Sequence, residues 1–267
     1  MPAEPLPPAG RLEVEEAGDA LVVRIANEAR ANALDEALLD GLVSLLNGPR
    51  PAEFRAVLLG GAGDRHFSAG LDLGDRPPEE LAAHLEDGAR RMQATARAIA
   101  GCAVPVVGVI NGAAFGGALE LAMACDWRIA RRGARLGMPA ARLGVVYGPE
   151  GLRRFVAALG PGRTRRLFLT GEPVDADEAL AIGLVDQVVE PGELWPAAHA
   201  AAAGVAAAAP LAVAGTRAIV RALSEGPLPL EVDATAGEWV ARAFASEDFR
   251  EGLTAFRERR PPVFRGR

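Results

Sequence analysis

The segment "NGAAFGGALELAMACDW", Asn111–Trp127, is the stretch that decides the fold of this chain. Three glycines fall within its first seven residues, and an apolar run follows that carries a single acid, Glu120. An ionised carboxylate in apolar surroundings costs free energy unless it is paired, hydrogen-bonded or used in chemistry. The pattern therefore indicates a glycine turn that opens a buried helix, and a carboxylate whose presence needs a reason.

The glycine turn predicts a site for negative charge. If the helix begins at Gly116 or Gly117, its first backbone N–H groups have no acceptor within the helix, and they point outward with the positive end of the helix dipole. Glu120 follows Gly117 by about one helical turn, roughly 4.5 Å along the same face. One face is thus expected to offer both a hydrogen-bond donor and a base. The structural alternative is that Glu120 ties back to the loop, as in a capping box.

A second glycine loop follows an earlier strand pattern. "RAVLLGG", residues 55–61, is typical of a strand, and the loop after it contains "HFSAGLDL", residues 66–73. Gly70 frees the main chain to turn and to expose the amide of Leu71. Neither loop matches GxGxxG or GxxxxGK[ST], which disfavours a dinucleotide or phosphate-loop function.

The rest of the chain predicts layered α/β packing, because short strands alternate with helices through the first two-thirds. A hairpin is expected over residues 12–26, and a buried strand over 104–110. Helices are expected at 34–47, 78–100, 195–208, 210–224, 230–245 and 247–259. We therefore divide the chain into a disordered segment (1–10), an α/β core (11–194) and a helical C-terminal subdomain (195–267), whose amphipathic helices are too short for a core of their own and favour self-association.

Composition excludes several classes of function. The 267 residues carry a net charge of −6, which argues against nucleic acid as a partner. The longest apolar runs are too short or too broken by glycine and proline to span a bilayer, and no basic leader precedes them, so we expect no membrane partner and a cytoplasmic location. Cys102 and Cys125 show no CxxC spacing and the three histidines are scattered, so no metal site is expected.

Together, and in this order, the two loops resemble the enoyl-CoA hydratase/isomerase family of the crotonase superfamily. The resemblance covers nearly the whole chain, including "RANAL", "ARLGMPAARLGV" and the closing "SEDFREGLTAFRERRPPVF". It implies a crotonase-like spiral of ββα units capped by C-terminal trimerisation helices, in a homotrimer or a hexamer built as a dimer of trimers. It also implies an acyl-CoA thioester as substrate, with coenzyme A as part of that substrate and no other cofactor.

The resemblance also implies roles for individual residues. The amides of Leu71 and Gly117 would form an oxyanion hole for the thioester carbonyl, and Glu120 would be one of two catalytic glutamates. Residues 67–70 would line the path of coenzyme A, Arg30 would meet a phosphate, and Asp72 would order its loop. The substrate and coenzyme set implied in this way is Arg30, Phe67, Ser68, Ala69, Gly70, Asp72, Leu73, Gly116, Ala140, Phe256 and Arg259, the last two reaching the coenzyme of a neighbouring subunit. The acyl pocket is expected to be lined by Leu73, Met92, Phe115, Met138, Val146 and Tyr147.

One position departs from the family pattern. The second catalytic glutamate of family hydratases matches Ala140, and a methyl group carries no proton. A lost acid or base costs roughly 10²–10⁴ in rate. Glu120 acting alone, or a second group supplied by Tyr147 or Glu150, would preserve hydration. Glu150 is equally an ordinary second residue of a helix that begins at Pro149.

Enoyl-CoA hydration is the first expectation. Isomerisation, decarboxylation and other enolate chemistry remain open, because the same oxyanion hole would serve them. A non-catalytic acyl-CoA-binding homologue is the remaining alternative.

Overall fold

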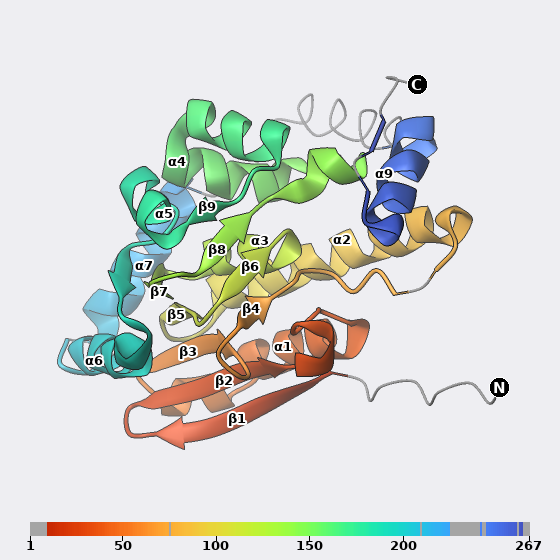
Figure 1. Cartoon of the computed structure of the whole chain (residues 1–267). Coiled ribbons are helices and arrows are strands. Elements are labelled where there is room, and N and C mark those ends of the chain that lie inside the picture. The colour runs from red at the N-terminus through yellow and green to blue at the C-terminus, as the bar shows by residue number, and fades with distance from the viewer. Residues whose placement is uncertain are drawn as a thin grey trace.

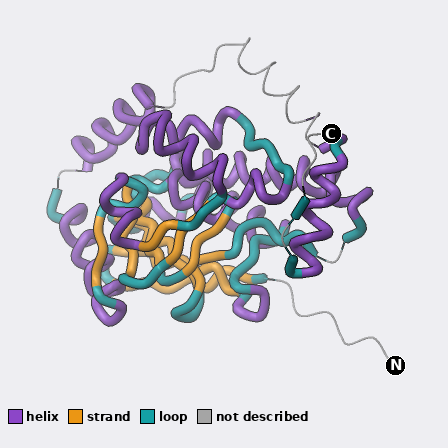
Figure 2. The backbone as a smooth tube through the Cα atoms, turned by 45° about the horizontal axis from the view of Figure 1, so that its top comes forward, coloured by secondary structure: helices purple, strands orange, loops and turns teal. Residues whose placement is uncertain are grey.

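Figure 1 shows the fold in a computed structural model, which describes residues 10–74, 76–208, 210–224, 241, 244–260 and 262–263. The chain builds two sheets and places helices around them. Figure 2 shows the strands gathered together, with helices along the outside. The mixed α/β class expected from the sequence is confirmed.

The larger sheet has six strands in the order β1-β2-β3-β5-β7-β10. The predicted hairpin is confirmed, since β1 pairs antiparallel with β2, whereas the remaining pairs are parallel. Every residue of β3 and β5 is buried, which explains their continuous apolar runs. The strands are β1 Arg11–Ala17, β2 Ala20–Ala26, β3 Ala56–Gly61, β5 Val106–Ile110, β7 Trp127–Arg131 and β10 Gln187–Val189.

The smaller sheet, in the order β4-β6-β8-β9, differs from the sequence expectation, which assigned both glycine regions to loops. Its strands have two or three residues, too few for an alternating pattern to be recognised. Parallel pairing of β4 with β6 brings the two glycine loops together, with His66 opposite Ala113 and Ser68 opposite Ala114. The strands are β4 His66–Ser68, β6 Ala113–Phe115, β8 Arg135–Gly137 and β9 Val174–Asp175.

The helices complete a repeating ββα unit. One strand of each sheet followed by a helix gives β3-β4-α2 and then β5-β6-α3, which confirms the expected spiral. The α-helices are α1 Glu36–Asn47, α2 Pro78–Gly101, α3 Gly117–Ala124, α4 Pro149–Thr170, α5 Ala176–Ile182, α6 Leu194–Ala206, α7 Pro210–Ser224 and α9 Glu247–Glu258. Short 3₁₀ helices are η1 Glu28–Arg30, η2 Arg50–Glu53, η3 Pro139–Leu143 and η4 Pro191–Glu193.

Helix α4 has a break in its middle. Gly160 has a φ of 73° and Pro161 follows it, so two helical halves meet at an angle. The predicted start of this helix is confirmed, because Gly148 is its N-cap and Pro149 its first residue. This start packs against α3, which makes α4 one wall of the site described below.

The C-terminal helices pack on the core in the single chain. Leu194, Ala198 and Ala202 of α6 are buried in one cluster with residues of the larger sheet. Phe249 and Leu253 of α9 cluster with Leu81 of α2. Residues 1–9, and most of the helix predicted at 230–245, lie outside the described part of the chain. The division of the chain at residue 194 stays a prediction.

Candidate active site

Two glycines bring the loops after β4 and β6 into contact. Gly70 has a φ of 94° and Gly116 a φ of 54°, values that residues other than glycine rarely adopt. A Cβ atom on Gly70 would lie 3.2 Å from the backbone nitrogen of Gly117, and one on Gly117 would lie 3.6 Å from the backbone nitrogen of Leu71. The amides of Leu71 and Gly117 are therefore neighbours across the two loops.

Both amides are available to a ligand. Leu34 donates its N–H to the carbonyl of Gly70, at 2.8 Å, and its carbonyl accepts from the N–H of Asp72, at 2.9 Å. These two hydrogen bonds use the residues on either side of Leu71 and do not involve the amide of Leu71 itself. Gly117 is the first residue of α3 and has no acceptor within that helix. Among the described residues neither amide donates a hydrogen bond. Two adjacent N–H groups of this kind can hold the oxygen of a polarised carbonyl.

Glu120 lies in the cavity that these amides reach. The cavity has a volume of about 470 Å³, and Leu71, Gly117, Glu120 and Tyr147 are among its lining residues. Glu120 is only 5% exposed, and its carboxylate packs against the first turn of α4: a Cβ atom on Gly151 would lie 2.8 Å from its Oε1. Among the described residues no side chain or backbone group donates a hydrogen bond to this carboxylate, which leaves its oxygen atoms free for a ligand.

Burial sets the protonation of Glu120. Loss of water around the carboxyl group raises its pKa to about 7, the charge of Glu150 adds to the rise, and Arg154 opposes it. The carboxyl group can therefore accept or donate a proton near neutral pH. The capping-box alternative is wrong, because Gly116 N–H donates to the carbonyl of Gly137, at 3.0 Å, and no side chain caps the helix.

Tyr147 stands beside Glu120. A Cβ atom on Gly151 would lie 3.5 Å from Cδ1 of Tyr147, and one on Gly116 would lie 3.7 Å from its hydroxyl oxygen. The ring packs edge to face on Phe168, with centroids 5.5 Å apart. Burial and the nearby charge of Glu120 raise the pKa of Tyr147, so the phenol stays protonated and can donate a hydrogen bond.

The other two positions near the missing carboxylate lie elsewhere. Ala140, in η3, is buried in the wall of a neighbouring hollow and does not line the cavity of Glu120. Glu150 also stays outside that cavity, and its carboxylate accepts from Nε of Arg97 at 3.1 Å. Of the two auxiliary groups expected from the sequence, Tyr147 lines the cavity of Glu120 and Glu150 does not.

The predicted coenzyme role of residues 67–70 stays a prediction, and burial limits it to the backbone at two of them. Phe67 and Ser68 are fully buried, so their side chains cannot line a path for coenzyme A, and only Ala69 is exposed. The hydroxyl of Ser68 instead accepts from Gly70 N–H at 3.1 Å, which orders the turn. Phe256 and Arg259, at the end of α9, are exposed, and their contact with a neighbouring subunit stays a prediction.

The expected acyl pocket is right in part. Met92, Val146 and Tyr147 line the cavity. Leu73 packs instead with Leu81 and Phe249, Met138 is fully buried in the core, and Phe115 is not among the lining residues. The sequence reasoning did not predict that one face of α2 lines the cavity. The residues of this face recur every three or four positions, a helical spacing that is visible in the sequence. This face contributes Glu86, Ala89, Arg90 and Gln93.

Two further findings bear on function. Residues 10–74, 76–208 and the later described segments hold no group of three or more His, Cys, Asp or Glu side chains that could bind a metal ion. None of the helices in these segments combines the length and apolar character needed to cross a bilayer.

The fold and the site define a class of protein in which two backbone amides face a buried carboxyl group, and comparisons with known proteins identify the family. Residues 15–267 match the enoyl-CoA hydratase/isomerase family, and the chain belongs to it. It is 33% identical to the short-chain-enoyl-CoA hydratase of Clostridium acetobutylicum, over 92% of this chain and 94% of that protein. It is 36% identical to the crotonyl-CoA hydratase of Syntrophomonas wolfei, over 78% of this chain and 79% of that protein.

A solved structure gives the corresponding match in three dimensions. A methylmalonyl-CoA decarboxylase in complex with 2-nitronate-propionyl-CoA superimposes with a TM-score of 0.86. The identity is 28%, and the alignment covers 96% of this chain and 98% of that one. The alignments thus cover between 79% and 98% of the length of these relatives, and the expected family and fold class are confirmed.

Proposed function

We propose that this protein is an acyl-CoA enzyme that forms a thioester enolate, and that hydration of a 2-enoyl-CoA is its reaction. One observation carries the proposal: two unpaired amides, of Leu71 and Gly117, meet in a cavity that also holds the buried carboxyl group of Glu120. Amides in that arrangement stabilise an oxyanion, and a carboxyl group beside them can move the proton at the neighbouring carbon.

The reaction proceeds through a single acid–base group. The thioester oxygen accepts from the amides of Leu71 and Gly117, which draws electrons from the conjugated double bond. Ionised Glu120 takes a proton from water, and the hydroxide adds to Cβ while the electron pair moves onto the thioester as an enolate. Protonated Glu120 then gives its proton to Cα. The pKa of about 7 suits both steps, because the group changes protonation readily near neutral pH.

Decarboxylation of a 2-carboxyacyl-CoA is the second candidate, favoured by Ala140 and by the likeness to the decarboxylase structure. In that reaction the Cα–carboxylate bond breaks, its electron pair forms the same enolate, and carbon dioxide leaves. Protonated Glu120 supplies the proton that Cα then needs. No second carboxylate is required, and the phenol of Tyr147 can donate to the departing carboxylate.

A paired assay tests both reactions. Purified protein is given crotonyl-CoA, with loss of the enoyl absorbance as the signal, and separately methylmalonyl-CoA, with release of carbon dioxide as the signal. Turnover of crotonyl-CoA that Glu120→Gln abolishes supports hydration. Carbon dioxide release without hydration supports the second candidate. Tight binding of both thioesters with no turnover would overturn catalysis and leave the binding homologue.

Assembly and location belong to the same proposal. We propose a homotrimer, or a hexamer of two trimers, in the cytoplasm, with coenzyme A entering only as part of the substrate. The exposed Phe256 and Val263 near the end of α9 support self-association, because apolar side chains on a surface are often covered by a partner. Light scattering of the purified protein tests this assembly.

A further inference from the structure

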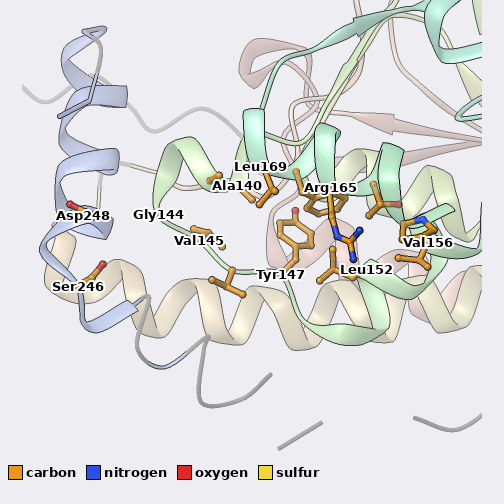
Figure 3. A pocket seen from close by; sticks show the side chains of 15 residues that line it. Ala140, Gly144, Val145, Tyr147, Leu152, Val156, Arg165, Leu169, Ser246 and Asp248 are labelled. Atoms are coloured by element: carbon orange, nitrogen blue, oxygen red, sulfur yellow. The ribbon is translucent and has the colours of Figure 1, made fainter. Parts of the chain in front are cut away.

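A second hollow lies directly behind Tyr147. It has a volume of about 630 Å³ and is formed by η3, the loop 144–147, both halves of α4 and the start of α9. Figure 3 shows Tyr147 in its middle, with Leu152 and Val156 on one side and, on the other, Asp248 of α9 and Ser246, which caps that helix. The break in α4 at Gly160 places two helical halves around this space.

The lining of the hollow is mostly aliphatic and aromatic, and its polar members include Ser246, Asp248 and the exposed Arg165. Leu152, Val156, Phe168 and Leu169 are its larger side chains, and Ala140 completes the wall in η3. The hydroxyl of Thr164 already donates to the carbonyl of Gly160, at 2.9 Å, so it does not require a polar ligand. Cavities of this size and character bind hydrocarbon groups.

The hollow adjoins the reaction cavity. Val145, Val146 and Tyr147 line both spaces, whereas Glu120 lines only the first and Ala140 only the second. The Tyr147 ring is therefore a partition between the reacting carbon atoms and the hollow. A glutamate in place of Ala140 would bring a charge into this apolar wall, at a cost in free energy. Alanine at this position keeps the wall suited to hydrocarbon.

On the side of the hollow away from Tyr147, apolar side chains are exposed to water. Val156 is 42% exposed and Leu169 is 72% exposed. Covering them would be favourable, and the continuity with the reaction cavity favours the substrate itself as the occupant.

We infer that this hollow binds the aliphatic part of a long-chain acyl-CoA, and that Ala140 and Tyr147 set the chain length the enzyme prefers. The inference rests on the proposed function and adds to it a substrate class. The chain leaves the reaction cavity past Val145 and Val146 and lies against α4. Each methylene buried there should raise affinity about fourfold, following ~0.8 kcal/mol per methylene.

In the test, a bulky side chain fills the part of the hollow that lies away from the reacting atoms. Val156→Trp should lower kcat/KM for 2-dodecenoyl-CoA by at least tenfold and leave crotonyl-CoA within twofold. Leu180→Trp is the matched control, because Leu180 lies on α5 outside the hollow and is also 42% exposed. Leu169→Glu, which brings a charge to the same rim, should repeat the chain-selective loss. Equal losses on both substrates, or no preference for the longer chain in the wild type, would overturn the inference.

Two further measurements keep this result separate from the proposed reaction. If crotonyl-CoA is not turned over, calorimetric titration with butyryl-CoA and lauroyl-CoA still tests the hollow: tighter lauroyl-CoA binding, lost in Val156→Trp, supports it. Light scattering of the same variants tests the competing occupant. A change in molecular mass without a change in chain preference would show that the hollow is an interface between copies of the chain, and would overturn the inference.

Discussion

The guanidinium of Arg30 lies 2.6 Å from the carboxylate of Asp72, across 42 residues of sequence, and this ion pair holds the loop that carries the Leu71 amide. Asp72 also accepts from Gly74 N–H at 3.0 Å, and its carbonyl contacts the His84 ring at 2.8 Å. Sequence reasoning assigned Arg30 to a phosphate and Asp72 to loop order. The structure shows the two side chains as one ion pair. Substituting each side chain in turn therefore distinguishes a phosphate contact of Arg30 from a shared role in ordering the loop.

Asp72→Ala should lower kcat roughly ten- to a hundredfold with little change in KM. A displaced Leu71 amide reduces the stabilisation of the transition state more than it reduces the affinity for substrate. Steady-state kinetics with crotonyl-CoA measures this. Arg30→Ala should give the same pattern, and the double variant should be no worse than either single one. The exposed pair Arg132–Asp177 is the control, since breaking it should leave kinetics within twofold. A higher KM in Arg30→Ala alone would instead indicate a coenzyme phosphate contact.

Glu120→Gln should lower kcat by roughly 10²–10⁴ while thioester affinity stays within about threefold, because the amide keeps the shape of the side chain and loses its proton transfer. Turnover and calorimetric binding of crotonyl-CoA measure the two effects. Glu150→Gln is the matched control: it removes a nearby charge that pairs with Arg97 and lies outside the cavity, so turnover should fall less than threefold. Comparable losses in both variants would contradict the assignment of Glu120 as the acid–base group.

The raised pKa of Glu120, about 7, predicts a pH profile that separates the two candidate reactions. Hydration needs the ionised group to accept a proton from water, so kcat/KM should rise with pH and level off above about 7. Decarboxylation needs the protonated group to donate, so kcat/KM should fall above about 7. A rate that is independent of pH between 5.5 and 8.5 would contradict both.

The same burial predicts how stability depends on pH. The folded pKa of Glu120 lies above its ordinary value of 4.5, so the folded state holds this proton more tightly than the unfolded state. Relative to Glu120→Gln, the free energy of unfolding of the wild type should therefore be highest below pH 4.5 and fall by a few kcal/mol as pH rises to about 7. Urea unfolding of both proteins at pH 4.5, 6 and 7.5 measures the difference, and parallel curves would contradict it.

Much of the fold could be predicted because its signals are local. The hairpin, the buried strands β3 and β5 and the helices α1 and α2 follow from periodicity over five residues or more. The strands of the smaller sheet escaped prediction because pairing between distant segments, as at Ser68 and Ala114, defines them. A local sequence pattern does not reveal which distant segments pair.

The candidate site divides in the same way. The turn at Gly116 and Gly117 and the carboxylate of Glu120 lie within five residues, so their relation is visible in the sequence. The Arg30–Asp72 pair and the burial of Phe67 depend on how separate segments pack. Tyr147 could be proposed as a substitute for the missing carboxylate, yet only the packing of α4 beside α3 shows that it lines the cavity of Glu120 while Glu150 does not.

Tyr147→Phe should lower turnover roughly tenfold or more without lowering the thermal midpoint, because it removes the phenol hydroxyl and keeps the ring on Phe168. Kinetics and thermal melting of the same preparation measure both properties. Tyr147→Ala, in contrast, should lower the thermal midpoint as well, since it leaves a cavity beside Phe168. Full activity in Tyr147→Phe would show that the ring acts by shape alone and that its hydroxyl takes no part in the reaction.

Gly151→Ala should reduce kcat/KM roughly tenfold or more, because the added Cβ atom would lie 2.8 Å from Oε1 and 3.2 Å from Cδ of Glu120. The carboxylate must then move away from α4 and from the carbon it serves. Alanine favours the helix, so the thermal midpoint should not fall in proportion. Gly162→Ala, in the same helix with no atom within 4 Å of the added group, is the matched control and should keep activity within twofold. Unchanged turnover in Gly151→Ala would mean that contact with α4 does not hold Glu120 in its catalytic position.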